Sequence, residues 1–124
     1  MAILFLTTDL MFSSRVAGAA ARLGMTLKTA ATPPALIELL AGAEPESLVL
    51  LDLNSPNVDP RQLAPSLRAS QNPPRAIIAY GPHVHEDRLA AATAAGCEEV
   101  LTRGQFNARM EETLAKWRAA SDAD

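Results

Sequence analysis

The feature that most constrains this chain is the sequence LVLLDLNSP at residues 48–56, an apolar run that ends in a carboxylate and then in turn residues. An apolar run this short, bounded by turn signals, predicts a buried strand of a parallel sheet, here over residues 47–53. In open α/β sheets, functional sites lie outside the carboxyl ends of the strands. Asp52, near the end of this strand, is therefore the first candidate for a functional residue.

Further apolar runs alternate with amphipathic or alanine-rich stretches, which is the order of repeated βαβ units. We expect strands at residues 3–7, 26–29, 47–53, 76–80 and 99–102, with a helix after each. Five strands joined by right-handed crossovers favour an α/β, flavodoxin-like, doubly wound parallel sheet with the strand order 2-1-3-4-5. In that order the first and third strands are neighbours, so residues 7–9 and Asp52 face one crevice with the loop after the fourth strand.

Capping signals mark where the helices begin and end. The pairs Thr32-Pro33 and Asp59-Pro60 each place a capping side chain before the proline that is favoured at the first helical position. Pro65 has no backbone N–H, so the helix after Asp59 is expected to be kinked, short, or begun only at Pro65. Glycines at positions 24, 42 and 96 are expected to end the first, second and fourth helices.

The helix after the fifth strand is expected to be continuous. Its apolar residues recur at helical spacing and form one stripe, made of Phe106, Met110, Leu114 and Trp117. Glu112 and Lys116, four residues apart, are expected to support this helix as an ion pair. Residues 1–120 are thus expected to form a single domain, and residues 121–124 a frayed tail.

Composition excludes several classes of protein. The 124 residues are 48% hydrophobic and 20% charged, the balance of a soluble globular domain. A net charge of −3 without a basic cluster predicts no nucleic-acid or membrane partner. The single Cys97 cannot form an internal disulfide and is expected to be buried and inert. The apolar N-terminal run stops at Thr7, short of a signal peptide or membrane span, so a cytoplasmic location is expected.

The order of elements, the Asp52 segment and the sequence AAG at residues 94–96 resemble a response-regulator receiver domain over nearly the whole chain. The resemblance implies a CheY-like fold. It also implies that the carboxylate at the Asp52 position accepts a phosphoryl group from a histidine kinase. Such transfer requires a divalent cation, which prefers carboxylate oxygens as ligands.

Five positions depart from the pattern that this resemblance implies. Thr7 and Thr8 stand where receivers hold the cation with two acidic residues. Gly81 stands at the position of a hydroxyl that follows the phosphoryl group, and Val100 at that of an aromatic residue that changes rotamer. Arg103 replaces a lysine and keeps its charge, but has a planar fork in place of a compact ammonium. Most of the phosphorylation machinery is therefore missing.

These departures predict a structural role for the remaining charges. We expect Asp52 and Arg103 to form an ion pair that mimics a neutralised site permanently. Asp9, Asp52 and the carbonyl of Asn54 could form a weak magnesium site, although a lone aspartate after a strand is more often a helix cap. No stable acyl phosphate and no cofactor are expected.

His83 and His85 suggest a second kind of site. Residues two apart in an extended loop point the same way, so both imidazoles could bind one metal near Asp52 or Asp9. No third ligand is fixed by the sequence. The alternative is that this loop only caps the following helix, whose first turn carries Glu86 and Asp87.

The sequence thus predicts a degenerate receiver, or pseudo-receiver, that acts in bacterial two-component signal transduction through protein contacts and is not an enzyme. The expected contact surface consists of the fourth helix, the fifth strand and the fifth helix, and it would bind an unidentified protein or a second copy of the chain. Two alternatives remain open. One is a working phosphoacceptor receiver that uses Asp52, and the other is a small metal-binding enzyme that uses the His83 and His85 loop.

Overall fold

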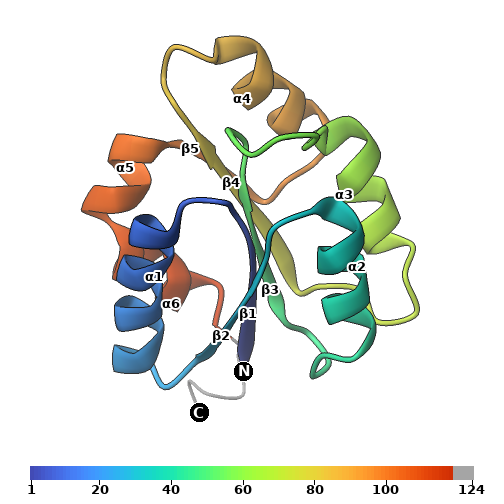
Figure 1. Cartoon of the computed structure of the whole chain (residues 1–124), viewed down its shortest axis with the longest axis vertical. Helices are drawn as coiled ribbons and strands as arrows, with labels where there is room; N and C mark the ends of the chain where they lie inside the picture. The colour runs from blue at the N-terminus through green and yellow to red at the C-terminus, as the bar shows by residue number, and fades with distance from the viewer. Residues whose placement is uncertain (119–124) are drawn as a thin grey trace.

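Five parallel strands form one sheet in the computed structural model, which describes residues 1–118 (Figure 1). Their order, β2-β1-β3-β4-β5, confirms the predicted topology. The strands are β1 (Ala2–Leu6), β2 (Thr26–Ala30), β3 (Leu48–Asp52), β4 (Ala76–Gly81) and β5 (Glu99–Thr102). The predicted tail at residues 121–124 lies outside the described residues.

Helices cover both faces of the sheet, as Figure 1 shows. The helices α1 (Leu10–Arg22), α5 (Arg103–Ala108) and α6 (Met110–Lys116) lie on one face, and α2 (Pro33–Ala41), α3 (Pro60–Arg68) and α4 (Glu86–Ala94) on the other. Each face has its own apolar cluster. Phe5, Leu50 and Phe106 belong to the cluster under α1, α5 and α6, whereas Leu4, Leu51 and Leu63 belong to the other. Burial on both faces explains why the central strands are almost entirely apolar.

Strand register determines which side chains meet at the carboxyl edge of the sheet. Leu6, the last residue of β1, pairs with Leu51 of β3, and Asp52 pairs with Tyr80 of β4. The loop after β1 therefore begins beside Asp52. The ends of the first and third strands are therefore neighbours, as the sequence predicted.

The predicted helix caps hold for α2 and α3. Thr32 accepts a hydrogen bond from the N–H of Ala35, and Asp59 accepts one from that of Arg61. Because α3 begins at Pro60 and has nine residues, it is short, and the suggestion that it begins only at Pro65 is wrong. Pro65 has no N–H to donate to the backbone carbonyl one turn earlier in α3. Because Pro65 is exposed, water can hydrogen-bond to that carbonyl instead.

The predicted continuous last helix is wrong. Arg109, at φ −126° and ψ 32°, interrupts it and separates α5 from α6. A capping box between Thr102 and Gln105 sets the direction of α5, while α6 begins again after the interruption. The predicted Glu112–Lys116 pair is also wrong, because the Lys116 ammonium lies 2.7 Å from Oε1 of Glu99 on the neighbouring β5.

Cys97 is half-buried and packs against the cluster under α2, α3 and α4. Burial raises the pKa of its thiol to about 11, so the thiol stays protonated and unreactive near neutral pH. Within residues 1–118, no helix combines the length and the apolar character needed to cross a membrane.

Candidate functional site at the carboxyl edge of the sheet

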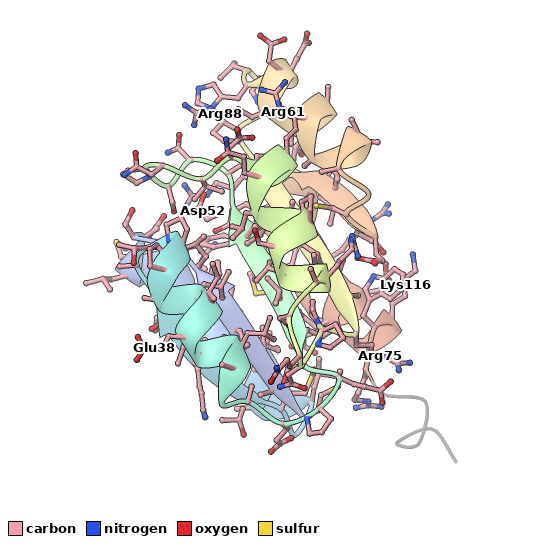
Figure 2. All side chains as sticks on the ribbon, turned by 90° about the vertical axis from the view of Figure 1, so that its right-hand side faces the viewer. Glu38, Asp52, Arg61, Arg75, Arg88 and Lys116 are labelled. Carbon is pink, nitrogen blue, oxygen red and sulfur yellow. The ribbon has the colours of Figure 1, made fainter. Side chains whose placement is uncertain are left out.

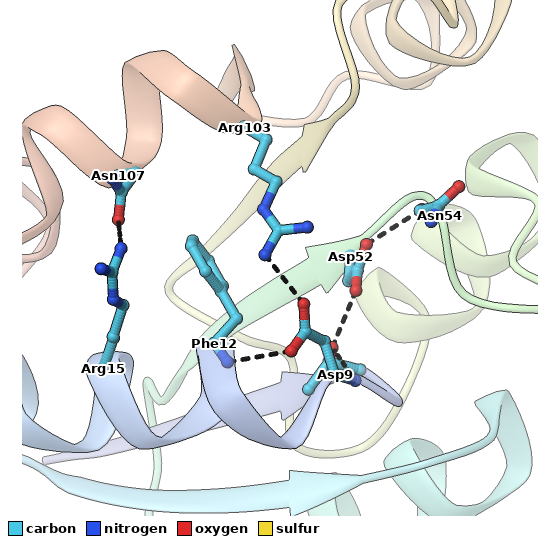
Figure 3. A network of polar contacts seen from close by, with 8 residues as sticks. Asp9, Phe12, Arg15, Asp52, Asn54, Arg103 and Asn107 are labelled. Atoms are coloured by element: carbon cyan, nitrogen blue, oxygen red, sulfur yellow. Dashed lines mark hydrogen bonds and ion pairs between the residues drawn. The ribbon is translucent and has the colours of Figure 1, made fainter.

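The polar residues that the sequence singled out gather where β1 and β3 end (Figure 3). Thr7 follows β1, Asp52 ends β3, Asp9 precedes α1, and Arg103 begins α5. Asn54 lies in the loop after β3. The structure therefore brings together side chains that are up to 96 positions apart, but it divides them into two separate networks.

The first network surrounds Asp52, whose residue is 6% exposed. Its Oδ2 accepts a hydrogen bond from the Thr7 hydroxyl at 2.7 Å, and its Oδ1 accepts one from the backbone N–H of Asn54 at 3.0 Å. Thr7 is 5% exposed, so the bond to Asp52 is shielded from water. Hydrogen bonds to a charged acceptor in such surroundings are among the stronger ones in proteins.

The second network surrounds Asp9, the N-cap of α1. Its Oδ1 accepts from the N–H of Phe12 at 3.0 Å, and its Oδ2 lies 2.8 Å from Nη2 of Arg103. The Phe12 N–H and the Arg103 charge together lower the pKa of the Asp9 carboxyl. The Arg103 guanidinium also lies over the Phe12 ring, 4.7 Å from its centroid. The capping role considered for Asp9 is confirmed.

The predicted ion pair between Asp52 and Arg103 is wrong. Within residues 1–118 Arg103 pairs with Asp9, and both oxygens of Asp52 accept hydrogen bonds from other groups. Half of the Arg103 side chain remains exposed in this arrangement. Reaching Asp52 would require burial of the guanidinium and the loss of its hydration, whereas the Asp9 carboxylate is available near the surface.

Thr8 and Gly81 take no part in either network. Thr8 is exposed, and its hydroxyl makes no hydrogen bond to any described residue. Gly81 ends β4 against Leu53, and a Cβ at this glycine would lie 3.2 Å from the Leu53 Cβ and 3.7 Å from Cδ2 of Leu89. Apolar side chains therefore occupy the space that a larger residue at position 81 would need.

Sequence reasoning missed Arg88 on α4. Its Nη1 donates a hydrogen bond to the backbone carbonyl of Leu53 at 2.9 Å and so ties α4 to the loop after Asp52. Arg88 and Asp52 lie in the upper half of the molecule in Figure 2, and Arg75 lies near its lower end. An exposed arginine in a helix carries no sequence signal for such a contact.

Two buried hydroxyls near Asp52 were also missed. The hydroxyls of Tyr80 and Ser55 have no hydrogen-bond partner among the described residues. Tyr80 lies beside Asp52 in register, and its ring stacks on that of Phe106 at 5.1 Å. Burial, with a smaller contribution from the Asp52 charge, raises the pKa of Tyr80, so its hydroxyl stays neutral. The alternation of side chains along β4, which places Gly81 and Tyr80 on opposite faces, was the available signal.

The histidine loop does not form the site considered for it. His83 is exposed. His85 occupies the N-cap position of α4, as the alternative for this loop expected, but its side chain makes no capping hydrogen bond. In the part of the chain that the structure describes, no three His, Cys, Asp or Glu side chains come together as metal ligands.

A magnesium ion, which the resemblance implies, does not fit the donors at this edge. Each carboxylate oxygen of Asp9 and Asp52 already accepts a hydrogen bond or an ion pair from the protein. Thr7 directs a proton, not a lone pair, at Asp52. Because magnesium binds carboxylate oxygens in a nearly ideal octahedron, the two separate networks do not provide a site for it.

The fold matches known structures, although the sequence does not match known families. No protein-family model matches the chain, and no curated protein matches it significantly by sequence. The receiver domain of a response regulator from Bermanella marisrubri has a TM-score of 0.81 at 20% identity, over 95% of this chain and 98% of that one. The receiver domain of a sensor histidine kinase from Pseudomonas aeruginosa, solved with magnesium in its active-site cleft, has a TM-score of 0.77 at 19% identity, over 94% and 95%.

A chemotaxis response regulator of Vibrio cholerae is similar in the same way, with a TM-score of 0.75 at 14% identity over 94% of this chain and 97% of that one. All three likenesses extend over nearly the full length of both chains. They agree with the strand order and with the placement of the helices on the two faces. The chain therefore has the fold of a response-regulator receiver domain.

Proposed function

We propose that this chain is a degenerate receiver, which acts in cytoplasmic two-component signalling through protein contacts and does not form an acyl phosphate. The observation that carries this proposal is the 2.7 Å hydrogen bond from the Thr7 hydroxyl to Asp52. A neutral donor occupies the place where phosphoryl transfer would need a cation and its acidic ligands.

The electrostatic argument follows from the charges at the edge. A phosphoryl group that approaches Asp52 would bring its own negative charge toward a buried carboxylate, and transfer needs positive charge to offset it. The nearest guanidinium that the networks provide, Arg103, is paired with Asp9. The barrier to phosphorylation therefore remains high in this arrangement.

The region that would respond to a phosphoryl group also supports the proposal. A switch needs an element with two alternative arrangements. Position 81 has no hydroxyl to follow the phosphoryl group, and Leu53 and Leu89 fill the adjoining space. Arg88 further holds α4 to the Leu53 carbonyl. We propose a single, constant arrangement of the loops after β3 and β4.

A domain with one constant arrangement can still present a binding surface. We propose that a partner protein binds the surface made by α4, β5 and α5, where α4 presents Ala90 and Ala94 to solvent. These small side chains allow close approach by a partner. A stable complex should bury at least about 1,200 Å² in total.

Intact-mass spectrometry tests the proposal. The chain is incubated with acetyl phosphate and magnesium, beside a receiver domain that is known to accept phosphate, and with Asp52→Asn as the matched variant. We expect no phosphate adduct on either form of this chain. A phosphate adduct on the unmodified chain that disappears in Asp52→Asn would overturn the proposal.

A further inference from the structure

The buried hydroxyl of Tyr80 is a polar group that the proposed function leaves without a role. Tyr80 is the only tyrosine of the chain, and its residue is 2% exposed. Its hydroxyl has no hydrogen-bond partner among residues 1–118. Because an unpaired buried hydroxyl destabilises a fold, native proteins rarely keep one. The surroundings of this hydroxyl therefore indicate the group that it binds.

Thr7, Asp52 and Tyr80 lie in a row across three neighbouring strands, on one face of the sheet. Phe5, Leu50 and Tyr80 all belong to the apolar cluster under α1, α5 and α6. Residues two apart along a strand point to the same face. Thr7 comes two residues after Phe5, and Asp52 two residues after Leu50. All three polar side chains therefore share the face that this cluster occupies.

The ring of Tyr80 reaches across β3 toward β1. Tyr80 belongs to β4, yet the centre of its ring lies 6.1 Å from that of Phe5 on β1. Phe12 lies at 5.1 Å on another side, and Phe106 stacks on the ring at 5.1 Å. Packing among three aromatic rings fixes the position of the phenol, so its hydroxyl cannot turn out to water. The partner of this hydroxyl has to come from the ends of β1 and β3.

Thr7 has one acceptor position left for such a partner. A threonine hydroxyl has one proton and two lone pairs. The Thr7 proton goes to Oδ2 of Asp52 at 2.7 Å, and one lone pair accepts the N–H of Asp9 at 3.0 Å. Burial is the main cause that raises the pKa of Tyr80; Asp52 acts on that pKa through its charge, and Thr7 through hydrogen bonding. The second lone pair of Thr7 is therefore the acceptor best placed for Tyr80.

We infer that Tyr80 is a positioning residue, whose hydroxyl donates to the second lone pair of Thr7 Oγ1. With a donor on each lone pair, the Thr7 proton has only the direction of Asp52 left to it. Thr7 then cannot turn a lone pair toward a cation beside Asp52. This inference deepens the proposed function and rests on it, because it gives the reason why a neutral hydroxyl stays a donor there.

Urea unfolding of Tyr80→Phe, Thr7→Val and the double variant tests the inference. Phenylalanine keeps the packed ring and removes only the hydroxyl. We expect Tyr80→Phe to raise the equilibrium constant for unfolding about fivefold, as the loss of a neutral hydrogen bond does. In the Thr7→Val chain the same substitution should raise it less than about twofold, because the acceptor is already gone. A hydroxyl without a partner predicts the opposite sign, so a Tyr80→Phe chain more stable than the original overturns the inference.

The Cζ carbon resonance of this single tyrosine gives a second readout that does not depend on stability. We expect the resonance to move in Thr7→Val, to return in Thr7→Ser, which restores the hydroxyl, and to stay in place in Thr8→Val, because Thr8 is exposed. Equal shifts in Thr7→Val and Thr7→Ser overturn the inference. Both measurements use the chain without a phosphodonor. A phosphate adduct on Asp52, seen by mass, would instead refute the proposed function, so the two failures are distinguishable.

Discussion

Replacing Thr7 by valine tests the contact on which the account of Asp52 rests. Valine keeps the shape of threonine but removes the hydroxyl that donates to Oδ2 of Asp52 at 2.7 Å. Both residues are buried, at 5% and 6% exposure, so water cannot easily replace the lost donor. A buried hydrogen bond to a charged group contributes about 1.5–3 kcal/mol, and we expect Thr7→Val to lower the free energy of unfolding by about 2 kcal/mol.

Urea unfolding of four proteins isolates the contribution of this contact. They are the original chain, Thr7→Val, Asp52→Ala and the double variant. We expect a coupling energy of about 2 kcal/mol between the two positions, a measurable part of a total stability of about 5–15 kcal/mol. Thr8→Val is the control and should change stability by less than about 0.5 kcal/mol, because Thr8 is exposed. A coupling energy below about 0.5 kcal/mol would refute the reasoning.

Three further predictions concern the surrounding structure. Gly81→Thr should lower the free energy of unfolding by about 1–3 kcal/mol, because its Cβ would crowd Leu53 at 3.2 Å. Gly104→Ala should not lower the free energy of unfolding, because no atom lies within 4 Å of an added Cβ at that position. Equal urea midpoints for the two variants would contradict this prediction. Asp9→Ala removes the N-cap of α1 and should lower the free energy of unfolding by about 0.5–2 kcal/mol. Arg103→Ala removes a half-exposed ion pair and should lower it by less than about 1 kcal/mol. If Arg103→Ala lowers the melting temperature more than Asp9→Ala does, the ion pair contributes more than the cap, and this prediction is wrong. Burial raises the pKa of Glu98, but hydrogen bonds from Arg68 and the Ile77 N–H outweigh burial and lower that pKa. The stability that these hydrogen bonds provide is therefore present at neutral pH and is lost on acidification below about pH 4.5. Glu98→Gln should show a flatter decline in the free energy of unfolding over this acidic range.

Most of the fold could be predicted because it depends on local patterns. Short apolar runs fixed the five strands, and the chain length with right-handed crossovers left one favoured strand order. The interruption at Arg109 could not be predicted in this way, since the apolar stripe from Phe106 to Leu114 continues at helical spacing across it. The helix is interrupted at Arg109, a position at which the hydrophobic pattern does not predict a break.

Four residues of the candidate site could be predicted from the sequence, but their pairing could not. Topology brings Thr7, Asp9, Asp52 and Arg103 to one edge, and the sequence is enough to infer that. Which carboxylate Arg103 binds depends on the cost of burying a guanidinium and on hydrogen bonds already made by Asp52. Those quantities come from side-chain packing, as does the contact of Arg88 with the Leu53 carbonyl.

In the function proposed for this chain, protein donors take the place of the cation at Asp52. Amide NMR of the chain during titration with magnesium, followed by beryllofluoride, tests it most directly, because the N–H groups of Asp9 and Asn54 donate to Thr7 and Asp52. We predict that these two resonances stay in place up to about 10 mM magnesium and after beryllofluoride is added. Saturable shifts of both resonances, abolished in Asp52→Asn, would contradict the account.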